Sequence, residues 1–374
     1  MLNALGIINV IENDQVLGEV SESRPFAAVP IDGRYRIIDF PLSNMVNAGI
    51  KSVGIFTHYK MGSLIAHLKN GREWNLDTKR RGLFFLSPDF SKYIFSPNKW
   101  DISHFTSRLG YIQSSTRKYV LISGCNMICN IDYHKVRDFH EERGADITIV
   151  CKRISPEERK KFEPCLLMDV NEDQQVHQFK AANEQSMDHE HLCLDMFFLS
   201  RDLLLEIIDE CAKQNKWDLV QDGFIRNSRN LKVVAYPFTG YLAKINSISN
   251  YFNHHMDLLN LDVWRELFYQ AGPILTKAKD SAPTRYTKDS SVHNSLVSND
   301  CIIAGEIENS VIFRSIKADR GSVIKNSVIL PKCTIEEGVE LEYAILDKGV
   351  HITKGKTIKG SKEHPVVIRK NDQL

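Results

Sequence analysis

The sequence lacks both a long apolar run and an excess of charge of either sign. Its 374 residues carry 48 Lys and Arg against 47 Asp and Glu, a formal net charge of +1. A chain so close to neutral has no field that would favour nucleic acid or an anionic membrane. The first residues, MLNALGIINVIENDQ, have no basic stretch, and Glu12 and Asp14 cut their apolar run short. We therefore expect neither a signal peptide nor a membrane span.

The sequence also lacks a paired metal-ligand spacing. Its eight cysteines are scattered, and Cys125 and Cys129 have neither a second cysteine pair nor a histidine cluster to accompany them. This argues against a zinc site. We expect buried, reduced thiols in a cytoplasmic protein with no metal site of its own.

Apolar runs alternate with amphipathic stretches up to about residue 270. The run ALGIINVI at 4–11 predicts a strand that is buried on both faces. Further strands are predicted at 52–57, 82–86, 119–123 and 147–151, helices at 41–47, 63–68, 101–117, 134–143 and 200–213, an aromatic-rich loop at 89–100 and hairpin-like pieces within 163–199. This alternation predicts a doubly wound, mainly parallel sheet of the α/β class.

Helical spacing disappears beyond residue 271, where Gly272, Pro273 and Pro283 indicate a linker. From residue 292 onward, aliphatic residues recur at intervals near six, with Asn, Asp, Gly and Lys between them: Val292, Val297, Ile302, Ile307, Val323, Val328, Ile335, Leu341, Ile352 and Ile358. This period predicts a parallel β-helix of hexapeptide coils, and an antiparallel sheet is the alternative. The predicted division is an α/β domain at 1–270, a linker at 271–290 and a β-helix at 291–374.

Three segments carry a resemblance to a known family. Residues 24–50, RPFAAVPIDGRYRIIDFPLSNMVNAGI, resemble KPAVPxGGxYRxIDFxLSNxxNSGI of bacterial and plant ADP-glucose pyrophosphorylases, also called glucose-1-phosphate adenylyltransferases. Residues 235–259 and 123–133 are similar to two further motifs of that family, so the resemblance spans essentially the whole chain. It implies a Rossmann-like nucleotidyltransferase domain followed by a left-handed β-helix. It also implies a reaction in which magnesium assists the joining of glucose 1-phosphate to ATP.

The residues that this reaction needs are replaced. The family's phosphate loop, GGxGxRL, corresponds here to NVIENDQVLG at 9–18, which has no paired glycines and no arginine. The two magnesium aspartates of the family correspond to Cys125 and Ser249, and the lysine of the 24–50 motif corresponds to Phe26. Thiol and hydroxyl groups are poor magnesium ligands. Asp132 remains, but we expect it to cap the next helix.

Substrate and effector positions are partly kept. The resemblance places Lys180, Asp218 and Asp222 near the family's sugar-phosphate site, with Cys193 and Asp195 in place of its serine and glycine. Helix capping or surface polarity is the alternative for the first three. Arg24 and Arg36 match basic residues that bind anionic effectors between the two domains in the family. Arg369, with Lys362 and Lys370, lies where it could reach the same cleft, and solvated surface charge is the alternative for these cations.

These replacements favour a catalytically degenerate, regulatory subunit of glucose-1-phosphate adenylyltransferase in bacterial glycogen synthesis. Such a subunit would have no intrinsic cofactor and would bind a sugar-phosphate or nucleotide effector. It would join a magnesium-dependent catalytic partner, most simply in a heterotetramer. Alone, it could form a homo-oligomer. An active nucleotidyltransferase with a rearranged site is the first alternative, with Glu12, Asp14 and Asp101 as metal ligands. A hexapeptide-repeat acyltransferase using His293 or His351, and a purely structural scaffold, are the others.

Overall fold

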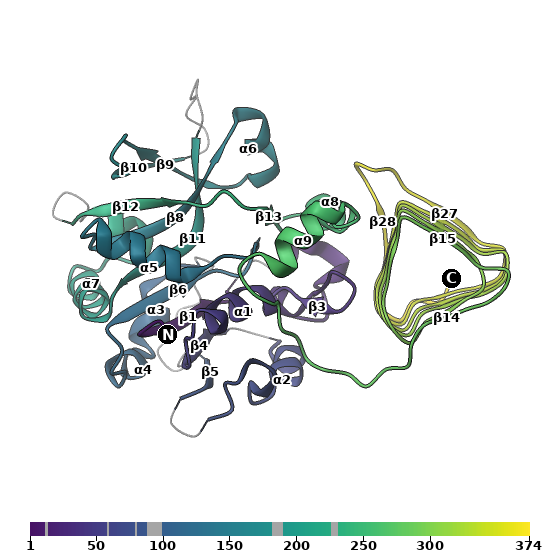
Figure 1. Cartoon of the computed structure of the whole chain (residues 1–374), viewed down its shortest axis with the longest axis horizontal. Helices are drawn as coiled ribbons and strands as arrows, with labels where there is room; N and C mark the ends of the chain where they lie inside the picture. Colours follow the sequence, from purple (N-terminus) through teal and green to yellow (C-terminus); the bar gives the residue numbers. More distant parts are fainter. Residues whose placement is uncertain (12–13, 58–59, 79–80, 88–98, 182–189, 226–230) are drawn as a thin grey trace.

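The computed structural model describes residues 1–11, 14–57, 60–78, 81–87, 99–181, 190–225 and 231–374. These residues form an α/β domain and a three-sided solenoid, joined by residues 270–284 (Figure 1). The predicted fold class is confirmed. Within the described ranges, no helix is long and apolar enough to cross a membrane. The loop predicted at 89–100 lies almost wholly outside them.

The α/β domain is built on a nine-stranded sheet in the order β10-β9-β11-β6-β1-β4-β5, with β8 paired to β11 and β12. Its centre is parallel, because β1 pairs in parallel with β4 and β6, and β4 with β5. Strand β11 runs antiparallel to β6 and β8. The strands are β1 (Ala4–Asn9), β4 (Val53–Phe56), β5 (Leu83–Leu86), β6 (Tyr119–Ser123), β8 (Ile147–Ile154), β9 (Leu166–Val170), β10 (Val176–Ala181), β11 (Glu190–Ser200) and β12 (Val233–Pro237).

Helices cover both faces of this sheet. Alternate residues of β1 point to opposite faces, so Ile8 joins one buried core and Ile7 the other. Residues of α1, α5 and α8 pack in the first core, and residues of α3, α4 and α7 in the second. The helices are α1 (Asp39–Asn47), α2 (Gly62–Leu68), α3 (Ile102–Thr106), α4 (Leu109–Gln113), α5 (Tyr133–Glu142), α6 (Pro156–Phe162), α7 (Arg201–Lys213), α8 (Ile248–Asp257) and α9 (Leu261–Tyr269), with short helical turns η1 (Asp14–Val20), η2 (Phe26–Ala28), η3 (Arg72–Trp74) and η4 (Leu219–Ile225).

The helix predicted over 101–117 is wrong as a single element. Arg108 leaves the helical region, with φ −127° and ψ 26°, and separates α3 from α4. Its guanidinium Nε donates a hydrogen bond to the carbonyl of Ser87 at 2.5 Å. A long-range contact of this kind overrides helix propensity, which favours continuation by only tenths of a kcal/mol per residue.

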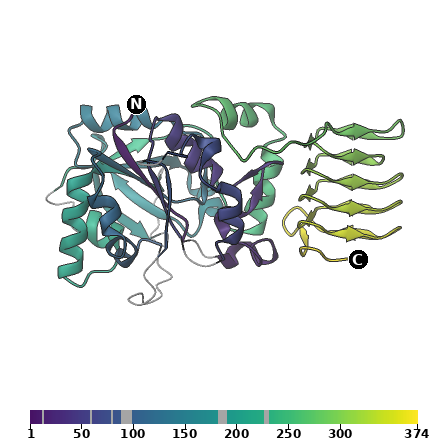
Figure 2. The same ribbon diagram turned by 90° about the horizontal axis from the view of Figure 1, so that it is seen from below.

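The solenoid consists of three five-stranded sheets, β14-β17-β20-β23-β26, β15-β18-β21-β24-β27 and β16-β19-β22-β25-β28. They form the sides of a triangle in Figure 1 and stacked coils in Figure 2. Every pair within them is parallel, so the β-helix prediction is confirmed and the antiparallel alternative is wrong. The strands are β14 (Arg285–Tyr286), β15 (Ser291–His293), β16 (Leu296–Val297), β17 (Ile302–Ile303), β18 (Glu306–Glu308), β19 (Val311–Ile312), β20 (Lys317–Ala318), β21 (Val323–Lys325), β22 (Val328–Ile329), β23 (Thr334–Ile335), β24 (Glu340–Glu342), β25 (Ala344–Leu346), β26 (His351–Ile352), β27 (Thr357–Lys359) and β28 (Val366–Ile368).

The two ends of the solenoid differ. At the C-terminal end, the β26 edge is covered by the chain's own tail, because Leu374 N donates to His351 O and His351 N donates to Asp372 O. At the N-terminal end, β14, β15 and β16 each have one sheet neighbour among the described residues. Tyr286 lies in register with the fully buried Ile303, yet 51% of Tyr286 is exposed because no coil among the described residues covers it. We call strands β14–β16 the open end.

The α/β domain contacts the solenoid through the segment that carries the strongest motif. The turn Asp32-Gly33 links β2 (Pro30–Ile31) to β3 (Tyr35–Arg36), and Gly33 O accepts a hydrogen bond from Ser298 Oγ at 2.9 Å. Gly33 has φ +77°, and a Cβ there would stand 2.8 Å from Ser298 Oγ. A glycine is therefore required both by the turn and by the close approach of the solenoid. A second short pair, β7 (Met127–Ile128) with β13 (Ala243–Lys244), precedes α8.

Candidate functional site

In an open α/β sheet, ligands bind beyond the carboxyl ends of parallel strands. Strands β1 and β6 lie side by side, with Ile8 opposite Ser123, so Asn9 and Gly124 share this edge of the sheet. The next residue, Cys125, is fully buried and packs in the apolar core. Its thiol therefore contributes to packing at the position where the family resemblance expects a magnesium carboxylate.

The second position that replaces a carboxylate, Ser249, lies on α8. Its hydroxyl donates to the carbonyl of Glu363 at 2.9 Å and so joins α8 to the C-terminal segment. Phe26, which stands at the family's lysine position, is fully buried in the core within η2. A thiol and a hydroxyl do not fit magnesium, which prefers carboxylate oxygens, and a phenyl ring does not supply the charge of a lysine. No group of three or more His, Cys, Asp or Glu residues that could hold a metal occurs in the described part of the chain.

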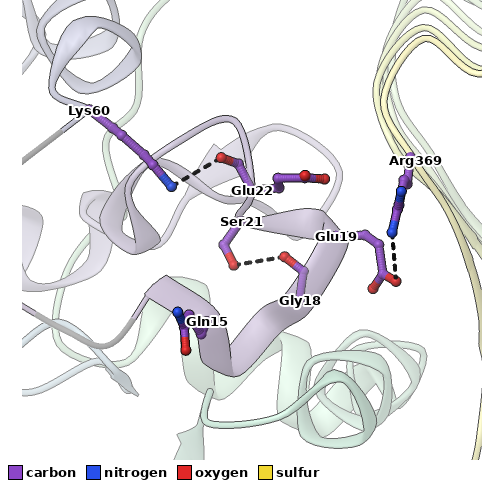
Figure 3. Close-up of a pocket in the computed structure, with 7 residues that line it drawn as sticks. All are labelled: Gln15, Gly18, Glu19, Ser21, Glu22, Lys60 and Arg369. Atoms are coloured by element: carbon purple, nitrogen blue, oxygen red, sulfur yellow. Dashed lines mark hydrogen bonds and ion pairs between the residues drawn. The ribbon is translucent and has the colours of Figure 1, made fainter.

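The region of the phosphate loop is a pocket of mixed charge. Gln15, Gly18, Glu19, Ser21, Glu22, Lys60 and Arg369 line a cavity of about 390 Å³ between η1 and the C-terminal segment (Figure 3). Lys60 Nζ donates to the carbonyl of Glu22 at 3.1 Å, and Arg369 lies 4.0 Å from the Glu19 carboxylate. The structure thus pairs Arg369 with an acid across this pocket. Glu12 lies outside the described residues, as does the side chain of Asp14.

The carboxylates named from the sequence act as local caps. Asp218 Oδ1 accepts from the backbone N–H of Val220 at 2.8 Å and of Gln221 at 2.7 Å. Asp222 Oδ2 accepts from the backbone N–H of Asp218 at 3.1 Å, so both acids order the turn at η4. Asp101 caps α3 and Asp132 caps α5, the latter as predicted. These contacts favour the capping alternative for Asp218 and Asp222.

The remaining candidates are dispersed. The backbone of Lys180 pairs with Leu167 in the β9–β10 hairpin, and its side chain lies outside what the structure describes. Lys362 lines a separate groove beside Tyr343 and Asn309. Lys370 Nζ donates to Ser23 Oγ at 3.4 Å, which places it near Arg24. Of the histidines considered for acyl transfer, His293 is exposed and His351 lies 2.7 Å from Glu336.

Arg24 forms a buried ion pair between the two domains. Its two Nη atoms each donate to one carboxylate oxygen of Asp347 at 2.9 Å. Arg24 is 6% exposed and Asp347 is fully buried. The fork geometry matches a carboxylate bidentately. The structure therefore gives Arg24 a contact that holds the α/β domain to the solenoid, and its role toward an effector stays a prediction.

Arg36 lies at the same junction, with its Nη1 donating to the carbonyl of Ser63 at 2.8 Å. Burial lowers its pKa, Asp39 opposes this shift, and Arg24 adds to it. Arg36 belongs to a set of basic residues that the fold gathers from segments far apart in the sequence. We call this set the cationic cluster; its members are Arg24, Arg36, Lys277, Lys279, Arg314 and Lys348.

Within the cluster, cations act on cations. Burial lowers the pKa of Lys279, and Arg314, Arg36, Lys277 and Lys348 lower it further. The pKa of Lys348 is likewise lowered by burial first and then by neighbouring basic residues. The charges that act most strongly on both ammonium groups are therefore of their own sign. Such a cluster is electrostatically prepared to accept an anion, which would relieve the repulsion.

The sequence did not single out Lys277, Lys279, Arg314 or Lys348. Lys277 and Lys279 belong to the linker, and Arg314 and Lys348 follow strands of the solenoid. Lysine is common both in linkers and after solenoid strands, so its position in the sequence does not indicate which residues of the other domain it will lie near. Only the docking of the two domains brings these residues together.

Comparison with known proteins agrees with this architecture. A model of the nucleotidyl transferase family matches residues 17–181, and a model described as GlmU-like, C-terminal hexapeptide matches residues 280–365. Glycogen biosynthesis protein GlgD of Geobacillus stearothermophilus is 37% identical over 370 residues, which cover 98% of this chain and 96% of the relative. GlgD of Bacillus subtilis is 34% identical over 366 residues, 98% and 95% of the two chains. Glucose-1-phosphate adenylyltransferase of Clostridium perfringens strain 13 is 29% identical over 330 residues, 86% and 81%.

Proposed function

Because the chain belongs to the ADP-glucose pyrophosphorylase family and matches relatives named GlgD along nearly its whole length, we propose that it is a catalytically silent, regulatory subunit of glucose-1-phosphate adenylyltransferase in bacterial glycogen synthesis. The observation that carries the proposal is the state of the two magnesium positions. Cys125 is buried in the apolar core, and Ser249 is bonded to the C-terminal segment. Neither the thiol nor the hydroxyl supplies a carboxylate oxygen to a metal, so these two residues do not support magnesium-dependent catalysis by this chain.

The partner is a catalytic subunit of the same family, which binds magnesium, ATP and glucose 1-phosphate. The open end of the solenoid supports such a partnership, because it exposes Tyr286 and leaves one edge of β14, β15 and β16 without a strand neighbour among the described residues. Exposed strand edges pair readily with other chains, and solenoids need their terminal coils covered. The terminal coil of a second solenoid presents strands with the same spacing as β14, β15 and β16, so we propose it as the surface that pairs with this edge. A heterotetramer would contain more than one such contact.

The test is ADP-glucose synthesis by three preparations: the purified chain, the catalytic subunit alone, and the two coexpressed. We expect the chain alone to synthesise no ADP-glucose. The coexpressed complex should differ from the catalytic subunit by about fivefold or more, either in its rate of synthesis or in the effector concentration that gives half-maximal response, because typical allosteric couplings are 1–3 kcal/mol. Robust synthesis by the chain alone would contradict the proposal. So would a complex that behaves as the catalytic subunit does.

The effector site of this proposal is the cationic cluster. We expect the double substitution Lys279→Ala/Lys348→Ala to raise the concentration of inorganic phosphate or of a sugar phosphate needed for half-maximal effect on the complex by about tenfold or more, since a hydrogen bond to a charged group contributes about 1.5–3 kcal/mol. The measurement is the dose–response of ADP-glucose synthesis. Lys362→Ala is the matched control, because Lys362 lies in a separate groove. Equal effects of the control and the double variant would move the effector site elsewhere.

A further inference from the structure

The chain's own residues 99–102 lie across the carboxyl ends of β1 and β6, where an open α/β sheet binds its ligand. Asn9 Nδ2, at the end of β1, donates to the carbonyl of Lys99 at 2.5 Å. The backbone N–H of Leu219 donates to Trp100 O at 2.8 Å, and that of Ile102 donates to Trp217 O at 2.8 Å. Trp100 also packs edge-on against Phe197, with ring centroids 5.2 Å apart. The segment is thus anchored both to the sheet and to the region of η4.

The side chain of Lys99 lies directly over Gly124, the residue that follows β6. A Cβ atom built on Gly124 would clash with Lys99 Nζ and would stand 2.8 Å from its Cε. The ammonium is 3.1 Å from Asp195 Oδ2, and the two side chains are only 12% and 18% exposed. A partly desolvated ion pair therefore fills the space at this end of the sheet, where the topology of the fold puts a ligand.

Asp195, which supplies the carboxylate of this pair, has an unusual backbone conformation. Its φ is +55°, in the left-handed region that costs most residues roughly 1–2 kcal/mol and that glycine, asparagine and aspartate tolerate best. The pairing of β11 with β8 shifts register between Cys193 and Phe197, and the carbonyl of Asp195 accepts from Gly124 N at 2.9 Å. Glycine would meet the backbone requirement with less strain. The backbone conformation therefore does not require the carboxylate of Asp195, and this carboxylate forms an ion pair with Lys99.

We propose that this chain closes its own ligand crevice: the Lys99 ammonium, held by Asp195, occupies the space that the phosphates and counter-cation of a nucleotide would need, and so excludes magnesium nucleotides and nucleotide sugars. The inference rests on the proposed function in taking this crevice to be catalytically silent. It adds that the chain lacks activity both because the metal ligands are missing and because the Lys99 side chain occupies the space of the nucleotide.

The experiment is calorimetric titration of the full-length chain with Mg·ATP and, separately, with ADP-glucose. The wild type should show no saturable binding of either up to millimolar concentration, apart from binding at the cationic cluster, which Lys279→Ala/Lys348→Ala would remove. The double variant Lys99→Ala/Asp195→Gly removes the pair and relaxes the backbone, so it should bind at least one of them about tenfold or more tightly than the wild-type limit, a change of about 1.4 kcal/mol. Lys135→Ala, an exposed lysine of α5, is the control and should match the wild type.

Two results would overturn the inference: wild type that binds as tightly as the double variant, or a correctly folded double variant that gains nothing. If the double variant does not fold, Lys99→Ala alone, which keeps Asp195, carries the same expectation. Unfolding midpoints of Lys99→Met, Asp195→Asn and their combination give a separate check, because a working ion pair makes their effects non-additive. Binding by the wild type without turnover would refute only the closed crevice, whereas turnover by the chain alone would refute the proposed function.

Discussion

Replacing Arg24 by methionine is expected to lower the free energy of unfolding by about 3–5 kcal/mol, because the substitution leaves the carboxylate of Asp347 buried without its counter-charge. The Arg24 guanidinium supplies both bidentate bonds to Asp347, and the one other donor to this carboxylate that the structure shows in its described residues is the backbone N–H of Lys348, at 2.6 Å from Oδ1. A single amide cannot neutralise a charge that is fully buried. The measurement is urea unfolding followed by circular dichroism, with limited proteolysis of the linker as a second readout.

The matched control is Arg320→Met, since the Arg320 side chain is 77% exposed and lies 3.7 Å from Asp289. It should change stability by no more than about 0.5 kcal/mol. The double variant Arg24→Met/Asp347→Asn removes both charges and keeps an acceptor for Lys348 N–H, so it should recover most of the loss. An Arg24→Met chain as stable as the control would show that the ion pair does not hold the domains together.

The same variants separate two roles for Arg24. If Arg24 acts on an effector only by docking the domains, the complex that contains Arg24→Met/Asp347→Asn should respond to inorganic phosphate as the wild type does. If the guanidinium also contacts the anion, that response should stay weak although stability returns. Either result shows whether Arg24 contacts the anion directly, because the double variant restores the docking of the domains without restoring the guanidinium charge.

The periodic parts of the fold could be predicted from the sequence, and the reason is physical. A solenoid coil buries one aliphatic residue per hexapeptide side, so the period near six is visible without a structure. Its exact register is not: the sequence placed Val323 in the series, whereas Ile324 is the residue that stacks between Ile307 and Leu341. It also placed Ile302 there, which is 46% exposed beside the fully buried Ile303. The parallel centre of the sheet is equally visible in its continuous aliphatic runs. The helix break at Arg108 could not be predicted, because it depends on the carbonyl of Ser87, which follows β5 and lies 21 residues away in the sequence.

The candidate site divides along the same line. The replacements at Cys125, Ser249 and Phe26 are visible in the sequence, because each interrupts a motif of contiguous residues, and their effect on catalysis stays a prediction. The pair Arg24–Asp347 spans 323 positions and Lys99–Asp195 spans 96. No pattern of neighbouring residues indicates these ion pairs, because the two members of each pair come together only in the folded chain. Contacts between domains and across a crevice are therefore what sequence spacing leaves undetermined.

Introducing charge at the open end of the solenoid is expected to abolish assembly with the catalytic subunit while leaving the chain folded. The double substitution Tyr286→Asp/Ile302→Asp changes one residue of the open end and one on β17, the strand that pairs with β14. The two residues are 51% and 46% exposed, so little of the core is disturbed. In a docked complex, the same carboxylates would be buried without partners, at a cost of several kcal/mol each. Size-exclusion chromatography with light scattering on the coexpressed subunits should show the complex lost, and the gain in ADP-glucose synthesis lost with it.

The opposite end of the solenoid supplies the control. Leu374 is 42% exposed, on the tail that covers the β26 edge, so Leu374→Asp adds charge of the same kind where we propose no partner. It should leave assembly intact. A complex that survives Tyr286→Asp/Ile302→Asp would exclude the open end as the contact and move it to the α/β domain. Loss of assembly in both variants would mean that charge on any part of the solenoid is disruptive. The difference between the two ends is thus the quantity that decides whether an uncovered coil, and not solenoid charge in general, recruits the partner.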